Sequence, residues 1–195
     1  MRQITLFLLV SATVAVLIAG TASAQVTRDF KMTLSSVGPG WNVAFGGEFD
    51  GAQMNLCAGQ TNLPSGSFIC NTVGYWNLES PDGWEPHSDC TGGLKAEFND
   101  PELTHVVRFK DGDVMYWFLD TTEWGYACYY PAEDGFVLVN HWQINGGSGR
   151  YKGATGSVSW ELPMEYIPLG DPTTPTALLG VGHDGVVTGT VTFAP

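Results

Sequence analysis

The stretch NGGSGRYKGATGSVSW, residues 145–160, places five glycines between two segments that have strand-like composition, 136–144 and 156–162. A glycine-rich loop binds phosphate when a helix follows it and, in the Walker form, when a lysine and a hydroxyl follow its last glycine. Here Arg150 follows Gly149, and no helical period comes after it. The stretch therefore predicts a tight corner between two antiparallel strands, and not a phosphate site.

Glycine allows the positive φ angles that such a corner needs. Arg150 is expected to pair with a carboxylate or to cap carbonyl groups near the turn, while Tyr151 and Ala154 return to the core. The residues that we assign to this structural turn motif are Gly146, Gly147, Gly149, Arg150 and Gly153.

Hairpin signals recur along the chain, because Asp-Gly occurs five times and Asn145-Gly146 is a further site of the same type. Between these pairs apolar and polar residues alternate, as in DFKMTLSSV at 29–37 and GLKAEF at 93–98. Alternation with period two is typical of half-buried strands. No long helical period is present after the N-terminal segment, so we predict an all-β protein.

The clearest hairpin is LTHVVRFKDGDVMYWFLD, residues 103–120. A two-residue turn at Asp111-Gly112 pairs Lys110 with Asp113 and places His105, Tyr116 and Asp120 on the mostly apolar, inward face. These three are the candidate ligand-binding residues of a cavity. The alternative is that His105 and Tyr116 are hydrogen-bonded core residues and that Asp120 marks the rim.

One residue of the pair Asn140 and His141 must also point inward, and the sequence does not choose between them.

The N-terminus has the form of an export signal, with Arg2, an apolar stretch from Ile4 to Ile18, and the small-x-small site Ala22-Ser23-Ala24. We therefore predict that residues 1–24 are a signal peptide and that 25–195 form a single domain in a secreted or periplasmic protein. Residues 57–92, which hold three of the cysteines and several prolines, are expected to form a disulfide-tied insert.

The even number of cysteines in an exported chain predicts two disulfides. Three pairings are open, and we favour Cys57–Cys70 with Cys90–Cys128. A zinc site is disfavoured, because the sequence has neither C-x-x-C nor two histidines at ligand spacing. Asp111-Gly112-Asp113 lacks the downstream acidic positions of a calcium loop, so no metal is expected.

Removal of residues 1–24 would leave 7 basic and 20 acidic residues, a net charge of −13. Nucleic acid and, after cleavage, membranes are therefore not expected as partners, because phosphate binding needs a basic face. The sequence is also compatible with a homo-oligomer.

The stretch INGGSGRYKGATGS, residues 144–157, resembles a motif of the allene oxide cyclase-like and dirigent-like barrel superfamily. The resemblance covers about 103–195. It implies a single antiparallel, eight-stranded closed β-barrel, calycin-like, with a largely apolar cavity. The motif belongs to the scaffold of that superfamily, so no catalytic residue is carried over.

Three functions follow as hypotheses. The first, which we favour, is non-catalytic: binding of a small apolar ligand, or a structural role. The second is a cofactor-free cyclase or isomerase, or dirigent-like guidance of an apolar substrate, through positioning in the cavity. The third is carbohydrate binding through exposed tryptophans such as Trp76 and Trp84. The alternative explanation of these residues is that large aromatic side chains commonly fill the interior of a barrel. No cofactor is expected.

Overall fold

The computed structural model describes residues 24–41, 48–79, 84–98, 101–132, 135–169 and 177–195. The predicted signal peptide lies, apart from Ala24, outside these residues. The elements in chain order are β1 (Val26–Trp41), β2 (Glu48–Thr61), β3 (Ser67–Glu79), β4 (Glu85–Pro86), η1 (Ser88–Cys90), β5 (Leu94–Phe98), β6 (Glu102–Phe109), β7 (Val114–Leu119), β8 (Gly125–Tyr130), β9 (Gly135–Gly147), η2 (Gly149–Tyr151), β10 (Thr155–Leu169) and β11 (Ala177–Phe193).

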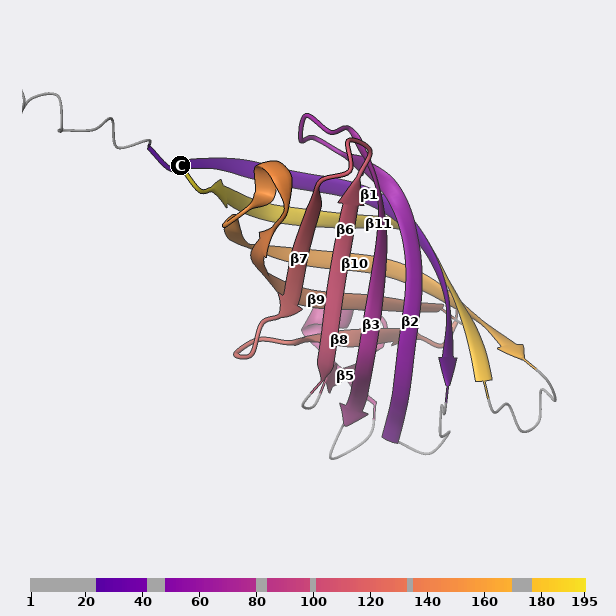
Figure 1. The fold of residues 1–195 in the computed structure, drawn as a ribbon. Helices are drawn as coiled ribbons and strands as arrows, with labels where there is room; N and C mark the ends of the chain where they lie inside the picture. The colour runs from indigo at the N-terminus through magenta and orange to yellow at the C-terminus, as the bar shows by residue number, and fades with distance from the viewer. Residues whose placement is uncertain (1–23, 42–47, 80–83, 99–100, 133–134, 170–176) are drawn as a thin grey trace, which may run out of the picture.

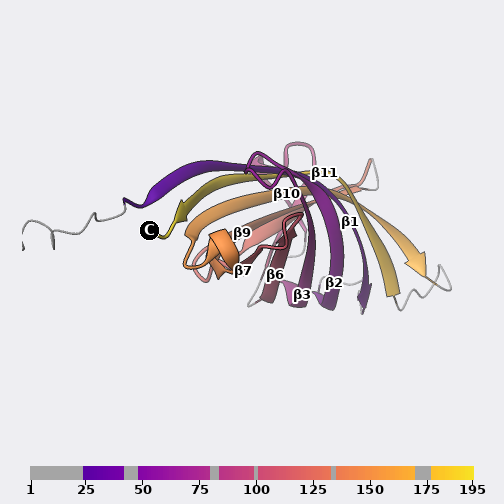
Figure 2. The same ribbon diagram turned by 45° about the horizontal axis from the view of Figure 1, so that its top comes forward.

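Eight antiparallel strands close into a barrel. The order around the ring is β10, β11, β1, β2, β3, β6, β7 and β9, and pairing of β9 with β10 closes it. This confirms the predicted fold class. In Figure 1, β2, β3, β6 and β7 lie in front and cross steeply over β9, β10 and β11 behind them. Figure 2 shows β1, β10 and β11 curving over the front strands.

At two positions in the barrel wall, next to β3 and next to β9, two shorter strands take the place of one long strand. β5 and β6 both pair with β3, at Leu78–Glu79 and at Phe68–Tyr75 respectively. β7 and β8 both pair with β9, and the five residues between them bulge opposite His141, whose backbone bonds to both ends of the bulge. β6 pairs with β7, and β5 pairs with β8. Between β3 and β9 the wall therefore consists of two strand pairs, one beyond the other along the strand direction.

The glycine corner joins β9 to β10 as predicted. Gly146, Gly149 and Gly153 have φ angles of 88°, 57° and 70°. Gly147 is required for a different reason, since a Cβ there would lie 2.0 Å from the Val114 carbonyl oxygen.

The donors of the corner are occupied by carboxylates of the chain itself. The backbone N–H and Nε of Arg150 donate to Oδ2 of Asp113 at 3.2 and 3.0 Å, and its terminal nitrogen pairs with Asp111. The corner is thereby held against the β6–β7 turn. Tyr151 is fully buried there and stacks on Phe109, with ring centroids 4.5 Å apart.

The predicted register of the β6–β7 hairpin is wrong by one residue. The Gly112 N–H donates to the Phe109 carbonyl and the Phe109 N–H to the Asp113 carbonyl, so the loop contains three residues and Gly112 has a φ of 92°. A one-residue shift moves every side chain of a strand to the other face.

As a result, Met115, Trp117 and Leu119 point inward from β7, while Tyr116 and Phe118 are 39% and 43% exposed. On β6 the predicted inward set is confirmed, since Leu103, His105, Val107 and Phe109 are all buried.

Both favoured disulfides are present, Cys57–Cys70 and Cys90–Cys128. The expectation that 57–92 forms an insert is wrong for most of its length. Cys57 and Cys70 are direct cross-strand partners of β2 and β3, inside the barrel wall. Cysteines and prolines suggested a loop, whereas the disulfide crosslinks two central strands.

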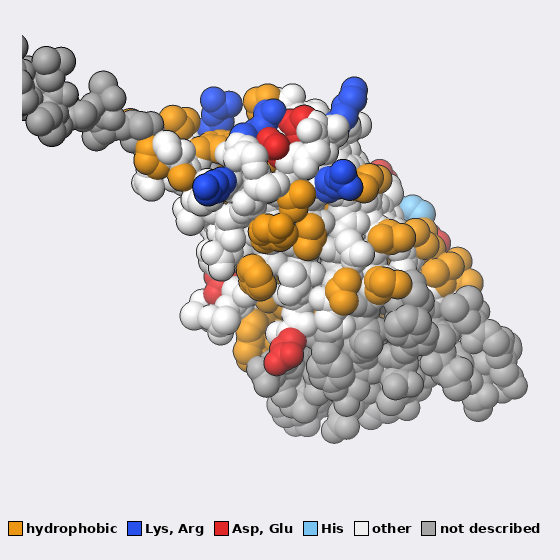
Figure 3. Space-filling model, viewed as in Figure 1, with side chains coloured by type: hydrophobic (Ala, Val, Ile, Leu, Met, Phe, Trp, Pro, Cys, Tyr) orange, Lys and Arg blue, Asp and Glu red, His pale blue; other side chains and the backbone are white. Residues whose placement is uncertain are grey.

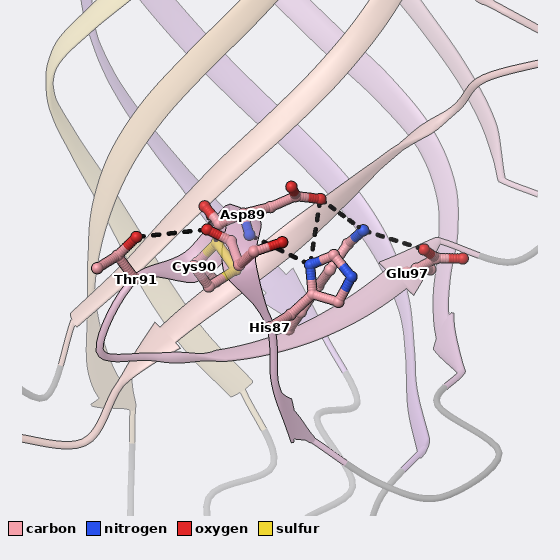
Figure 4. A network of polar contacts seen from close by, with 8 residues as sticks. His87, Asp89, Cys90, Thr91 and Glu97 are labelled. Carbon is pink, nitrogen blue, oxygen red and sulfur yellow. Dashed lines mark hydrogen bonds and ion pairs between the residues drawn. A yellow bond between two sulfur atoms is a disulfide. The ribbon is translucent and has the colours of Figure 1, made fainter.

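The segment around η1 lies outside the eight-stranded ring, and Cys90–Cys128 ties it to β8. Figure 4 shows the polar network beside this disulfide. Lys95 Nζ lies 2.9 Å from Asp89 and 3.1 Å from Glu97, and His87 Nδ1 lies 3.3 Å from Asp89. The hydrogen bond from Lys95 lowers the pKa of the exposed Asp89 carboxyl. Within the described part of the chain, no helix has the length and apolarity needed to cross a membrane.

The corrected register yields a paired prediction. Trp117→Ala removes a fully buried ring and should cost about 3–5 kcal/mol of unfolding free energy, whereas Tyr116→Ala on the outer face should cost under about 1 kcal/mol. Urea unfolding of both variants at pH 7.5, with disulfides intact, measures the difference. Equal losses, or a larger loss for Tyr116→Ala, would show that the hairpin has the other register.

Candidate ligand-binding site in the barrel lumen

A belt of polar side chains crosses the inside of the barrel at mid-height. Asn55 pairs with Thr72, Thr72 with His105, and His105 with Trp117, so that inward-facing residues of β2, β3, β6 and β7 lie in one row. Asn140 of β9 also points inward. The polar belt, as we call it, consists of the buried polar residues of the described chain: Ser36, Asn55, Thr72, His105 and Asn140.

His105 is the centre of this belt and is fully buried. Its Nδ1 lies 2.7 Å from the Thr72 hydroxyl, and its Nε2 has no hydrogen-bond partner. Its ring is boxed by the indoles of Trp117, Trp160 and Trp142, with centroid distances of 4.7, 5.0 and 5.5 Å. Desolvation in this box lowers the pKa of His105 to about 3, so the imidazole is neutral at physiological pH.

The sulfur atoms of Cys57 and Cys70 and the ring nitrogens of His105 approach one another within 4.8 Å. Metal ions bind the cysteine thiolate. Here the two sulfur atoms are joined in a disulfide, so neither is a thiolate. The cluster is a structural crosslink beside the polar belt.

A small cavity lies next to the belt, and the space open to a water centre in it is about 10 Å³. A space of this size holds roughly one water molecule. Around it, Nδ2 of Asn140 and the indole N–H groups of Trp142 and Trp160 have no partner among the described residues. The lining residues are Asn55, Thr72, Leu103, Leu138, Asn140, Trp142, Trp160 and Leu162.

Three of the predicted site residues therefore have different fates. His105 points inward, but its partner Thr72, and not His105 itself, lines the cavity. Tyr116 is on the outer face, so its predicted inward position is wrong.

Asp120 is also not in the lumen. Asp120 lies in the bulge between β7 and β8. Its carboxylate accepts hydrogen bonds from the Thr122 hydroxyl, from the Thr122 backbone N–H and from the exposed Gln143 side chain of β9. These hydrogen bonds lower its pKa to about 2. Its predicted inward position followed from the hairpin register that proved wrong.

Sequence reasoning did not choose Asn140 over His141, and it missed Asn55 and Thr72. The signal for Asn140 is the alternation of Leu138, Asn140, Trp142 and Ile144, all of which are buried. A polar residue among alternate buried residues of a strand belongs to the polar belt. This can be recognised only when it is known which alternate residues of the strand face inward.

Three of the tryptophans whose side chains are described fill the interior. Trp117, Trp142 and Trp160 are at most 3% exposed. Trp84 is partly buried and meets the rings of Tyr129 and Phe136 at centroid distances of 6.1 and 5.8 Å. The side chain of Trp76 is not among those described, so the predicted sugar platform of Trp76 and Trp84 stays a prediction.

No protein-family model matches the chain, and no curated protein or solved structure matches it either. Membership of the allene oxide cyclase-like and dirigent-like superfamily therefore stays a prediction.

Burial of His105 predicts a specific loss of stability in acid. Its folded pKa of about 3 lies below the ordinary 6.5, so the unfolded chain takes up the proton first. Stability is fully present above pH 6.5 and falls as pH drops towards 3. Between pH 7.5 and 5, the free energy of unfolding should fall by about 2 kcal/mol because of this residue.

Urea unfolding of the wild type and of His105→Gln at both pH values measures this contribution. The variant should lack it, and the Asp120 carboxylate does not interfere, because its lowered pKa matters only below about pH 4. The same pH dependence in both proteins would refute a buried, neutral His105.

Proposed function

We propose that the protein is an exported, non-catalytic binding barrel that holds a small, mainly apolar ligand at the polar belt. Because the cavity has room for one functional group only, the ligand would place one hydrogen-bonding group there, against Asn140 and the indole N–H groups of Trp142 and Trp160, and its apolar part would lie over the leucines that line the cavity. The observation that carries the proposal is that these buried donors have no partner among the described residues and belong to residues that line one small cavity. Buried polar groups are normally satisfied by protein, water or ligand.

The direction of entry follows from the packing at the two ends. At the end near the glycine corner, Tyr151 stacks on Phe109 and meets the tilted ring of Phe193 at a centroid distance of 5.9 Å, so aromatic rings fill this end. The ligand would therefore enter from the opposite end, over Leu103, Leu138 and Leu162, which line the cavity. Apolar walls with a few convergent polar groups are typical of small-molecule sites.

A binding role is favoured over a cyclase or isomerase role by the state of His105. The ring is enclosed by three indoles, and with a pKa of about 3 it is neutral and only weakly basic at neutral pH. General acid–base catalysis works best with a pKa near the operating pH. The room beside Thr72 also suits a water or a single functional group better than a reacting chain.

Export is supported by the two disulfides, which form and persist in oxidising compartments. The motif at 144–157 and the closed eight-stranded ring agree with what the superfamily resemblance implies about fold. Fold alone does not determine function, so the site residues carry the proposal.

Asn140→Leu is the sharpest test of this site, because it removes the unpaired donor. We expect at least about tenfold weaker binding of 1-naphthol together with unchanged or higher stability, since a buried unsatisfied amide is destabilising. Quenching of the emission of Trp142 and Trp160 during titration gives the affinity, and urea unfolding gives the stability.

The matched control is His141→Leu, which changes the next residue of β9 and should leave binding unchanged. Leu138→Trp should abolish binding by filling the cavity, and native mass spectrometry of the purified protein should show a co-purified small molecule in the wild type only. Binding that survives both Asn140→Leu and Leu138→Trp would refute the lumen site, as would a wild type that binds neither probe nor co-purified molecule.

A further inference from the structure

A group of large apolar side chains lies exposed on one side of the barrel. Eight of the nine exposed large hydrophobics of the described chain belong to β1, β2, β3 and β7, and seven of these, all except Val26, lie on the wall that these strands form with β6. Figure 3 shows apolar side chains gathered on the side formed by β2, β3, β6 and β7. The apolar face, as we define it, comprises Val37, Met54, Leu56, Ile69, Val73, Tyr116 and Phe118, which are 39% to 59% exposed.

The strand registers place these residues side by side around Asn71, which is the partner of Leu56 on β2 and of Val106 on β6. Val37 pairs with Leu56, and Met54 pairs with Val73. Across β6, half-buried Val106 and Thr104 connect β3 to Tyr116 and Phe118, their partners on β7. With strands about 4.8 Å apart, the face spans about 20 Å across five strands and about 15 Å along them. This lies in the range of the largest apolar patch on a monomer, which often marks an interaction site.

β6 carries opposite charges at the two ends of the same face. Its outward residues run Glu102, Thr104, Val106 and Arg108, with the acidic and basic ends both exposed. Neither Glu102 nor Arg108 forms an ion pair with another described residue. The strand is therefore complementary in charge to a second β6 that runs in the opposite direction.

We propose that the apolar face binds a second copy of this chain in a two-fold symmetric dimer. The two-fold axis runs across the strands in the plane of the interface, at the height of His105. This places Glu102 of each copy against Arg108 of the other. A two-fold interface uses the same surface of both copies and must be self-complementary.

The same axis matches apolar residues on β2 and β7 with one another, while on β3 it places Val73 against Asn71 of the second copy. Asn55, Thr72 and Trp117 share the height of His105, so the axis lies midway between Met54 and Leu56 on β2 and between Tyr116 and Phe118 on β7. Met54 then faces Leu56 of the second copy, and Tyr116 faces Phe118. An axis along the strands would instead bring the two Arg108 side chains to the same height.

The size of the face is consistent with this partner. Stable interfaces bury about 800 Å² per partner, with an apolar centre and a polar rim. The apolar face provides about 300 Å² of flat centre by the strand spacing. Glu102, Arg108 and the exposed Lys110 lie at its rim.

Sedimentation velocity of the full-length chain, expressed in a secreting host, tests the state of association from 1 to 100 µM. The expected species at the upper end has twice the mass of the chain. Glu102→Arg and Arg108→Glu should each weaken dimerisation at least about tenfold, because each creates two like-charge contacts across the axis.

Charge exchange distinguishes this geometry from any other. The double variant Glu102→Arg/Arg108→Glu should restore the dimer to within about threefold of the wild type, and an equimolar mixture of the two single variants should form a heterodimer. Lys152→Glu, which makes the same charge change as Arg108→Glu but lies in the exposed segment after η2, should leave dimerisation unchanged. Circular dichroism melts confirm that all variants are folded.

A monomer at 100 µM, a trimer, or single variants that dimerise like the wild type would each overturn the proposal. The proposal would also be overturned if the two single variants dissociate and the double variant does not regain dimerisation. If the chain is monomeric, flotation with phosphatidylglycerol vesicles then reports whether a lipid surface covers the face instead. Because the readout is mass, the outcome is independent of ligand binding in the lumen.

Discussion

The pairing of β9 with β10 is the contact on which the closed barrel depends. It runs through ten residue pairs from Phe136–Met164 to Asn145–Thr155, and without it the sheet would end in two long open edges. Open edges are prone to pair with other chains, and closure removes them. The glycine corner makes the pairing local in sequence, because it reverses the chain within a few residues.

Two different demands explain the glycines of this corner. Gly146, Gly149 and Gly153 adopt positive φ angles, which cost other residues free energy. Gly147 and Gly156 instead lie where neighbouring backbone comes too close for a side chain, with Cβ positions 2.0 and 2.1 Å from the carbonyl oxygens of Val114 and Thr190. The ion pairs of Arg150 with Asp111 and Asp113 then hold the corner against the far hairpin, so ring closure and hairpin position are coupled.

The wall formed by β2, β3, β6 and β7 has different features on its inner and outer faces. Inward residues of β2, β3 and β6 build the polar belt, and outward residues of the same strands and of β7 build the apolar face. An antiparallel sheet with one solvated face usually carries polar residues on that face, whereas the outer face here is largely apolar. A neutral, boxed histidine inside and an exposed apolar sheet outside both carry a free-energy cost, and a bound group at each place would offset it.

The sequence by itself determined the all-β class and the glycine corner, because these follow from local turn chemistry and period-two alternation. The eight-stranded barrel was implied only by the family resemblance, and the sequence left three disulfide pairings open, of which the favoured one is present. The buried face of β6, including His105, also followed from alternation within one strand. Only the tertiary structure decided the register between paired strands, and with it which residues of each strand face inward. The turn after Phe109 has three residues where Asp-Gly suggested two, so Tyr116 faces outward, and Asp120 lies in a bulge that only pairing with β9 creates. Similarly, Cys57 and Cys70 crosslink wall strands, because register across β2 and β3 is set by burial of the whole sheet and not by the residues around each cysteine.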